Sequence, residues 1–95
     1  MTFQLTLHLK REYFEQIERG EQEFEFRPKT PYWHKHLIDR KYKTIRLVCG
    51  YPKRGEKARE MIVRYRGWLP KIVKHPNFGN KPVHVFAIFV HDRIN

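Results

Sequence analysis

The sequence predicts an α+β domain: a small mixed β-barrel of five to six strands with two short helices early in the chain. Three observations support this fold class. Short runs of alternating apolar and polar residues recur along the chain and are bounded by Gly and Pro, as in half-buried strands. Apolar residues at helical spacing occur only in the first half of the chain. The length of 95 residues suits one domain spanning residues 1–95.

The chain begins with a predicted strand followed by a predicted helix. Residues 2–9 alternate, and the side chains expected to face the core are Phe3, Leu5, Leu7 and Leu9. Residues 10–19 then place apolar side chains three and four positions apart, which indicates a short amphipathic helix with Tyr13, Phe14 and Ile17 on its buried side. Gly20 ends this helix, because glycine adopts a left-handed conformation without strain.

Residues 21–27 are predicted to form the second strand. Alternate residues of a strand share a face, so Phe24 and Phe26 are expected to point toward the core. The opposite face carries the charged residues Glu21, Glu23, Glu25 and Arg27. This face leads directly into a segment with a lysine and two aromatic residues. The pattern indicates a binding cleft, although a solvated edge strand would have the same pattern.

A second helix and a third strand are predicted next. Thr30 can cap a helix that has Pro31 at its first position, so we expect a helix over residues 31–39. Leu37 and either Tyr32 or Trp33 would form its apolar side. Residues 43–49 alternate again and predict a strand whose inward residues are Ile45 and Leu47.

The remainder of the chain predicts strands and loops. Residues 59–68 alternate, with Met61, Val63 and Tyr65 on one side. The proline-containing residues 70–82 are expected to be irregular, with one short strand at residues 71–73. Residues 83–91 are nearly all apolar, which is typical of a central strand buried on both faces.

The charge and the aromatic content favour a nucleic-acid partner. The formal net charge is +10, and aromatic residues make up 15% of the chain. Cations bind phosphates and flat rings stack on unpaired bases, so the combination favours RNA or a nucleotide. Basic charge alone would also fit an anionic membrane surface or an acidic protein partner.

Other features narrow the expected context. The longest apolar run, residues 85–90, is far shorter than the roughly 20 residues of a membrane-spanning helix, so we expect no membrane segment. The single cysteine, Cys49, fits a reducing compartment, and we expect a cytoplasmic monomer in which this residue is small apolar packing. The six histidines lack the spacing of metal ligands, so no metal and no cofactor are expected.

Two segments resemble the ASCH domains of the PUA-like superfamily. The family's marker, Gly-x-Lys-x-x-Glu-x-Arg, joins a helix end to the next strand. Here the marker segment has the matching residues Gly20, Glu25 and Arg27, with Gln22 at the position of the lysine. The later segment Ile45-Arg46-Leu47-Val48-Cys49-Gly50-Tyr51 resembles the family's strand and Gly-Tyr turn. Together with the residues at 27–33, the likeness is to small stand-alone members of bacterial and phage origin and covers most of the chain.

The resemblance implies a PUA-like barrel with a cleft that binds RNA or a nucleotide. Some relatives are enzymes: one branch hydrolyses an acetylated cytidine with the marker lysine and a threonine on the marker strand, and another is described as cleaving RNA. Gln22 and Glu25 stand at those two places and cannot supply the cation or the hydroxyl. The alternative function is a metal-independent ribonuclease or small nucleoside hydrolase. Glu25 would then be the acid or base, and Lys29 or Lys53 would stabilise the developing negative charge.

Eight residues are predicted to bind RNA or a nucleotide. Glu25 and Arg27 could read a base edge by accepting and donating hydrogen bonds, or they could form a structural ion pair. Lys29, Lys53 and Arg54 would contact phosphates, and Arg46 would belong to a basic stripe across the barrel, although each taken singly could be ordinary surface charge. The two aromatic residues would stack on bases. The full set is Glu25, Arg27, Lys29, Trp33, Arg46, Tyr51, Lys53 and Arg54.

Overall fold

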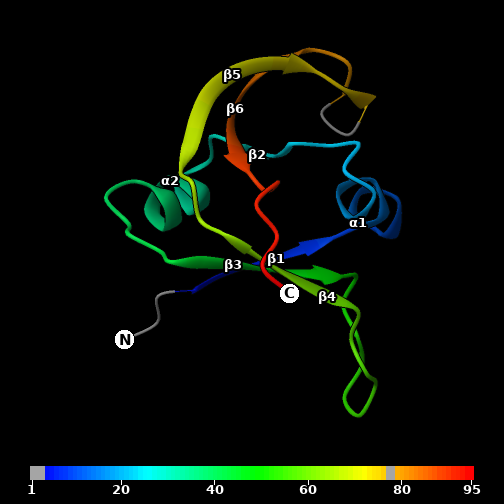
Figure 1. Cartoon of the computed structure of the whole chain (residues 1–95). Helices are drawn as coiled ribbons and strands as arrows, with labels where there is room; N and C mark the ends of the chain where they lie inside the picture. Colours follow the sequence, from blue (N-terminus) through cyan, green and yellow to red (C-terminus); the bar gives the residue numbers. More distant parts are fainter. Residues whose placement is uncertain (1–3, 77–78) are drawn as a thin grey trace.

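A computed structural model describes residues 4–76 and 79–95 of the chain. These residues form two three-stranded sheets and two helices, which confirms the α+β class (Figure 1). Thr2 and Phe3, the first residues of the predicted N-terminal strand, lie outside the described residues. The elements in chain order are β1 (Gln4–Leu9), α1 (Arg11–Glu18), β2 (Phe24–Pro28), α2 (Pro31–Leu37), β3 (Thr44–Cys49), β4 (Glu60–Arg64), β5 (Trp68–Lys74) and β6 (Pro82–Phe89).

The first sheet has the strand order β1-β3-β4 and mixed pairing. β1 runs parallel to β3, with Leu7 opposite Leu47, and β3 runs antiparallel to β4. Parallel neighbours need a long crossover connection. Here the connection from β1 to β3 contains α1, β2 and α2. Ile45 and Leu47 of β3 are fully buried, as the alternation predicted.

The second sheet has the order β2-β6-β5 and is antiparallel throughout. β6 lies in its centre, and residues 85–88 of this strand are all buried, so the predicted central strand is confirmed. The prediction of one strand over residues 59–68 was wrong. Gly67 has a φ of 86°, and the turn there separates β4 from β5. The short strand expected at residues 71–73 is part of β5, which contains Pro70; an edge strand tolerates proline.

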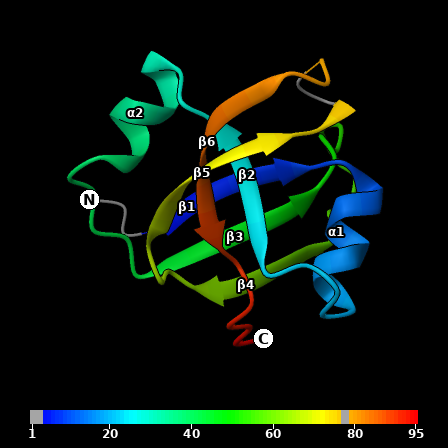
Figure 2. The same ribbon diagram turned by 90° about the horizontal axis from the view of Figure 1, so that it is seen from above.

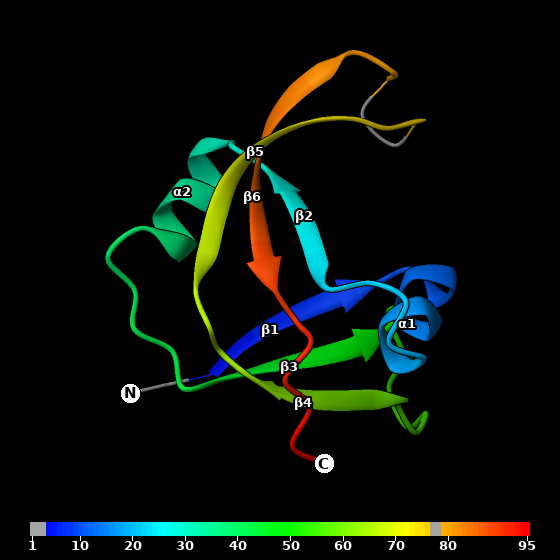
Figure 3. The same ribbon diagram turned by 45° about the horizontal axis from the view of Figure 1, so that its top comes forward.

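The hydrophobic core lies between the two sheets, and the helices close it from opposite sides (Figures 2 and 3). Phe14 and Ile17 of α1 and Leu37 of α2 join the strand residues in one buried cluster. Within residues 4–76 and 79–95, no helix is long and apolar enough to cross a membrane. Cys49 is half-buried and packs against the core cluster.

Local capping fixes where each helix begins and ends. At the end of α1, Gly20 has a φ of 76° and donates to the Ile17 carbonyl, while Glu21 donates to the Gln16 carbonyl. These two bonds form a Schellman motif and confirm the predicted stop. α2 begins as predicted, because the Thr30 hydroxyl accepts a hydrogen bond of 3.3 Å from the Trp33 amide. It ends at Leu37, two residues before the predicted boundary.

The strands form two separate sheets, and no closed barrel is detected among the described residues. On one side the sheets are linked, since the segment after β6 makes a single bridge between Arg93 and Val63 of β4. On the other side β1 and β2 are both edge strands. There a side chain spans the gap: Arg27 of β2 donates to the His8 carbonyl of β1. This unpaired seam between β1 and β2 positions the candidate site.

Candidate functional site

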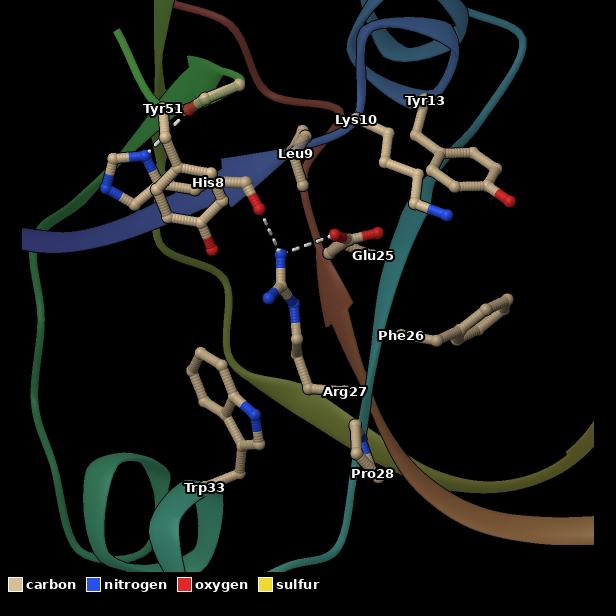
Figure 4. A pocket seen from close by; sticks show the side chains of 11 residues that line it. His8, Leu9, Lys10, Tyr13, Glu25, Phe26, Arg27, Pro28, Trp33 and Tyr51 are labelled. Carbon is tan, nitrogen blue, oxygen red and sulfur yellow. Dashed lines mark hydrogen bonds and ion pairs between the residues drawn. The ribbon is translucent and has the colours of Figure 1, made fainter. Parts of the chain in front are cut away.

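A pocket of about 360 Å³ lies at the seam between β1 and β2 (Figure 4). Its volume falls in the lower part of the range of small-molecule sites, roughly 300–1,000 Å³. Side chains from both sheets, both helices and the loop after β3 contribute to its walls. The lining residues are His8, Leu9, Lys10, Tyr13, Glu25, Phe26, Arg27, Pro28, Trp33, Gly50 and Tyr51.

An ion pair between Glu25 and Arg27 forms the polar part of the pocket. Arg27 Nη2 lies 2.7 Å from Glu25 Oε2 and also donates to the His8 carbonyl at 2.9 Å. The two side chains are only 16% and 17% exposed, so the pair is largely withdrawn from solvent. The Nε–H group of Arg27 is buried and has no acceptor among the described residues. The two residues share one face of β2, as the strand spacing predicted.

The other face of β2 differs from the prediction. Phe24 and Phe26 are half-buried and lie outside the core cluster, so the expectation that they face the core was wrong. Their rings pack against each other, and Phe24 also packs against Phe89 and under the Lys71 ammonium. The strand begins at Phe24, so Glu21 and Glu23 precede it. The charged face of β2 therefore points toward β1, and its aromatic face points outward.

Burial changes the acid strength of Glu25. Loss of solvation raises the pKa of its carboxyl group above the usual value, because burial disfavours the charged form. The Arg27 charge, the hydrogen bond from Arg27 and a backbone hydrogen bond from Phe26 act in the opposite direction but do not cancel the effect. A carboxyl group in this position can accept hydrogen bonds when ionised and donate one when protonated.

The raised pKa of Glu25 predicts a specific pH dependence of stability. As pH falls through the folded-state pKa, the folded protein gains a proton before the unfolded chain does, so stability rises. The gain is complete below the unfolded carboxyl pKa of about 4.3. We therefore expect wild type to gain stability relative to Glu25→Gln as pH falls from neutral toward that value. Urea unfolding of both proteins at a series of pH values measures this difference.

The comparison with Glu25→Gln removes effects that both proteins share. One of these comes from Glu15, since its hydrogen bonds from Arg59 and Arg11 hold the pKa of that carboxyl below its usual range. Glu15 alone makes the protein less stable as pH falls. A difference between wild type and variant that stayed constant with pH would contradict a raised pKa at Glu25.

Aromatic rings form two sides of the pocket. Tyr51 is 81% exposed as a residue, and its ring stacks on His8, with the ring centroids 4.5 Å apart. His8 is held by a 2.9 Å hydrogen bond between its Nδ1 and the Gly50 carbonyl, so Nδ1 carries a proton. Trp33 lies on the other side, and the Arg27 guanidinium lies 5.0 Å from its ring centroid. Figure 4 shows Arg27 between Trp33 and the His8–Tyr51 stack.

The structure gathers half of the predicted site residues in this pocket. Glu25, Arg27, Trp33 and Tyr51 all line it. Four predicted residues do not line it: Lys29, Arg46, Lys53 and Arg54.

Each of these four residues lies outside the pocket, in a different environment. Lys29 lies over the Phe86 ring, and Arg46 forms a 2.7 Å ion pair with Glu60 of the neighbouring strand. Lys53 and Arg54 are exposed on the loop between β3 and β4. They follow Tyr51 closely in sequence, but neither of them lines the pocket. The predicted catalytic role of Lys53 is therefore unsupported by its position.

Sequence reasoning missed three polar residues that line the pocket: His8, Lys10 and Tyr13. The alternation over residues 2–9 puts His8 on the face of the first strand opposite Leu7 and Leu9, but nothing in the sequence places that face beside β2. Lys10 and Tyr13 lie at the start of α1, on the opposite side of Glu25 from Arg27 (Figure 4). The connection from β1 into α1 was a usable signal, since it brings both side chains to the strand end that β2 approaches.

The pocket has no metal-binding character in the part of the chain described. No group of three or more His, Cys, Asp or Glu side chains is arranged to hold a metal ion among residues 4–76 and 79–95. Comparisons of the chain with protein-family models, curated proteins and solved structures found no match. The resemblance to ASCH domains therefore stays a prediction.

Proposed function

We propose that the pocket binds a nucleotide, either free or as part of an RNA strand. One observation carries this proposal: a largely buried acid–base pair lies between flat aromatic rings in a cavity of about 360 Å³. The charged pair supplies an acceptor and donors for a base edge, and the rings supply stacking surfaces. The proposal also takes the two sheets as halves of an open PUA-like barrel, in agreement with the resemblance in sequence.

The side chains suggest a division of roles. The Glu25 carboxylate accepts from an amino or imino group of the base, and the Arg27 guanidinium donates to a ring nitrogen or carbonyl. The exposed Tyr51 ring covers one face of the base. Lys10 is exposed at the edge of the pocket and supplies a cation for phosphate. The net charge of +10 favours the approach of an anionic ligand.

Substitution of Tyr51 provides the main test of the proposal. Because this ring is exposed, Tyr51→Ala should weaken binding without unfolding the protein. We expect an affinity loss of about 5–150-fold, corresponding to about 1–3 kcal/mol for one stacked base. Isothermal titration calorimetry with the four nucleoside 5′-monophosphates and with a short single-stranded RNA measures the loss. Binding of the RNA should also weaken with salt, with a log–log slope near −0.7 per phosphate contacted.

Ile72→Ala is a matched control, because Ile72 is an exposed apolar residue of β5 outside the pocket. It should bind as wild type does. Equal affinity of wild type and Tyr51→Ala for every ligand would contradict the proposal. The hydrolase alternative is tested with the same samples in EDTA, where cleavage of the RNA or hydrolysis of the nucleotide would show a metal-independent enzyme. The raised pKa of Glu25 favours the hydrolase alternative, because it would suit a general acid. The position of Gln22 gives it no support, since the Gln22 side chain donates to the Phe24 carbonyl and does not line the pocket.

A further inference from the structure

A second aromatic surface lies on α2, beside the pocket but not lining it. Tyr32 is 59% exposed as a residue, and its ring stacks on the His36 ring, with centroids 4.2 Å apart and an interplanar angle of 27°. We call these two rings the α2 platform. An exposed tyrosine on a short helix is ordinary. A tyrosine ring stacked on a second ring is held in one orientation, so it presents a fixed flat surface on which a base can stack.

Hydrogen bonds fix the platform in place. His36 Nδ1 lies 2.7 Å from the Tyr32 carbonyl, and the Tyr42 hydroxyl donates to the His36 carbonyl at 2.6 Å. Leu37 anchors the helix in the core. A stacking partner would therefore meet rings that are already ordered, so little conformational freedom is lost on binding.

The platform is continuous with the wall of the pocket. The Tyr32 ring makes an edge contact with the ring of Trp33, with centroids 5.0 Å apart, and His36 lies at 6.4 Å from the same ring. Trp33 itself lines the pocket. A ligand that leaves the pocket along α2 would pass directly from Trp33 to Tyr32.

The charge along this path suits a phosphate backbone. Residues 26–38 contain no Asp or Glu, but they contain three cations, Arg27, Lys29 and Lys35. The acidic residues of the neighbouring elements are concentrated instead on α1 and the segment after it, at Glu12, Glu15, Glu18, Glu21 and Glu23. Phosphates that continue from the pocket along α2 therefore meet cations and no carboxylate within residues 26–38, while Lys10 remains the cation at the α1 edge of the pocket.

We propose that the α2 platform is a second base-stacking site, so that the ligand is a single-stranded nucleic acid with one base in the pocket and its neighbour on Tyr32. This inference rests on the proposed function. It adds the class of ligand and the path that the ligand takes from the pocket along α2. A free mononucleotide would use the pocket alone. A dinucleotide would use the pocket and the platform together.

A comparison of mononucleotide and dinucleotide binding tests this inference. The probes are the nucleoside 5′-monophosphate that binds wild type best and the homodinucleotide of the same base, in ribo and deoxyribo forms. We expect wild type to bind the dinucleotide about 5–150-fold more tightly, the equivalent of one further stacked base. Tyr32→Ala should abolish this gain and leave mononucleotide affinity within about twofold of wild type. Tyr32→Phe should retain the gain, since stacking needs only the ring.

The outcomes separate the two proposals. If wild type binds the mononucleotide but gains nothing from a second nucleotide, or if Tyr32→Ala keeps the gain, the platform is not a binding site and the pocket proposal stands. If wild type binds neither probe, both proposals fail. A gain of equal size with RNA and DNA supports stacking as its source, whereas a gain seen only with RNA would show that the 2′-hydroxyl, not Tyr32, provides it.

Discussion

Arg27→Met is expected to lower the free energy of unfolding by about 3–5 kcal/mol at neutral pH, because it leaves the buried Glu25 carboxylate without its cation. The variant also leaves the His8 carbonyl at the free edge of β1 without its donor. Thermal or urea unfolding measures the loss, which corresponds to a fall in Tm of roughly 10 °C or more for a domain of this size. Part of the loss should be recovered at acidic pH, where Glu25 is protonated in the folded state.

Arg46→Met is the matched control for this prediction. Arg46 forms an ion pair of the same 2.7 Å length, also from a strand, but the two side chains are 36% and 38% exposed. An exposed pair contributes about 0–1 kcal/mol, so this variant should be close to wild type. The double variant Glu25→Gln/Arg27→Met should be more stable than Arg27→Met alone, since it removes the unpaired charge. If the two arginine variants lost equal stability, burial of the Glu25–Arg27 pair would not matter energetically.

Phe14→Ala is expected to destabilise the protein by about 3–5 kcal/mol, the usual loss when a large aromatic residue is removed from a core. Phe14 is 1% exposed and fixes α1 against the sheets, and the Arg59 guanidinium covers its ring at 5.2 Å. α1 carries Tyr13, and Lys10 precedes it directly, so one wall of the pocket depends on this anchor. Denaturant unfolding gives the loss in stability.

Two further variants show whether the effect of Phe14→Ala comes from the cavity it creates. Phe14→Leu fills most of the space and should lose clearly less stability than Phe14→Ala. Leu69→Ala removes a large apolar side chain from an exposed position of β5 and should change stability little. A Phe14→Ala protein as stable as Leu69→Ala would mean that α1 is held by other contacts.

The elements that could be predicted from the sequence are those specified by nearby residues. The stop at Gly20 and the cap at Thr30 depend on one turn of helix each, and the structure has both. Ile45 and Leu47 were found by alternation, because β3 has one buried and one less buried face. The break at Gly67 was missed because the alternation continues through it, whereas in the structure the chain passes from the first sheet to the second there, at a glycine with positive φ.

The candidate site could be predicted only where the chain itself brings residues together. Glu25 and Arg27 are two positions apart on one strand, so their shared face was certain once the strand was recognised. Which side of that strand faces inward depends on β1, and the aromatic side chains of Phe24 and Phe26 suggested the wrong one. His8 is far from both residues in sequence and meets them only through tertiary packing.

The seam between β1 and β2 has a consequence for how the molecule behaves in a crowded solution. Both strands leave backbone donors and acceptors on a free edge, and such edges invite pairing with strands of other molecules. Charged side chains directed into the seam oppose such pairing, because a strand from another molecule that paired there would remove the remaining solvent from these charges at a cost in free energy. Glu25 and Arg27 are placed there. We therefore expect the charged pair that shapes the pocket also to disfavour edge-to-edge association of the chain.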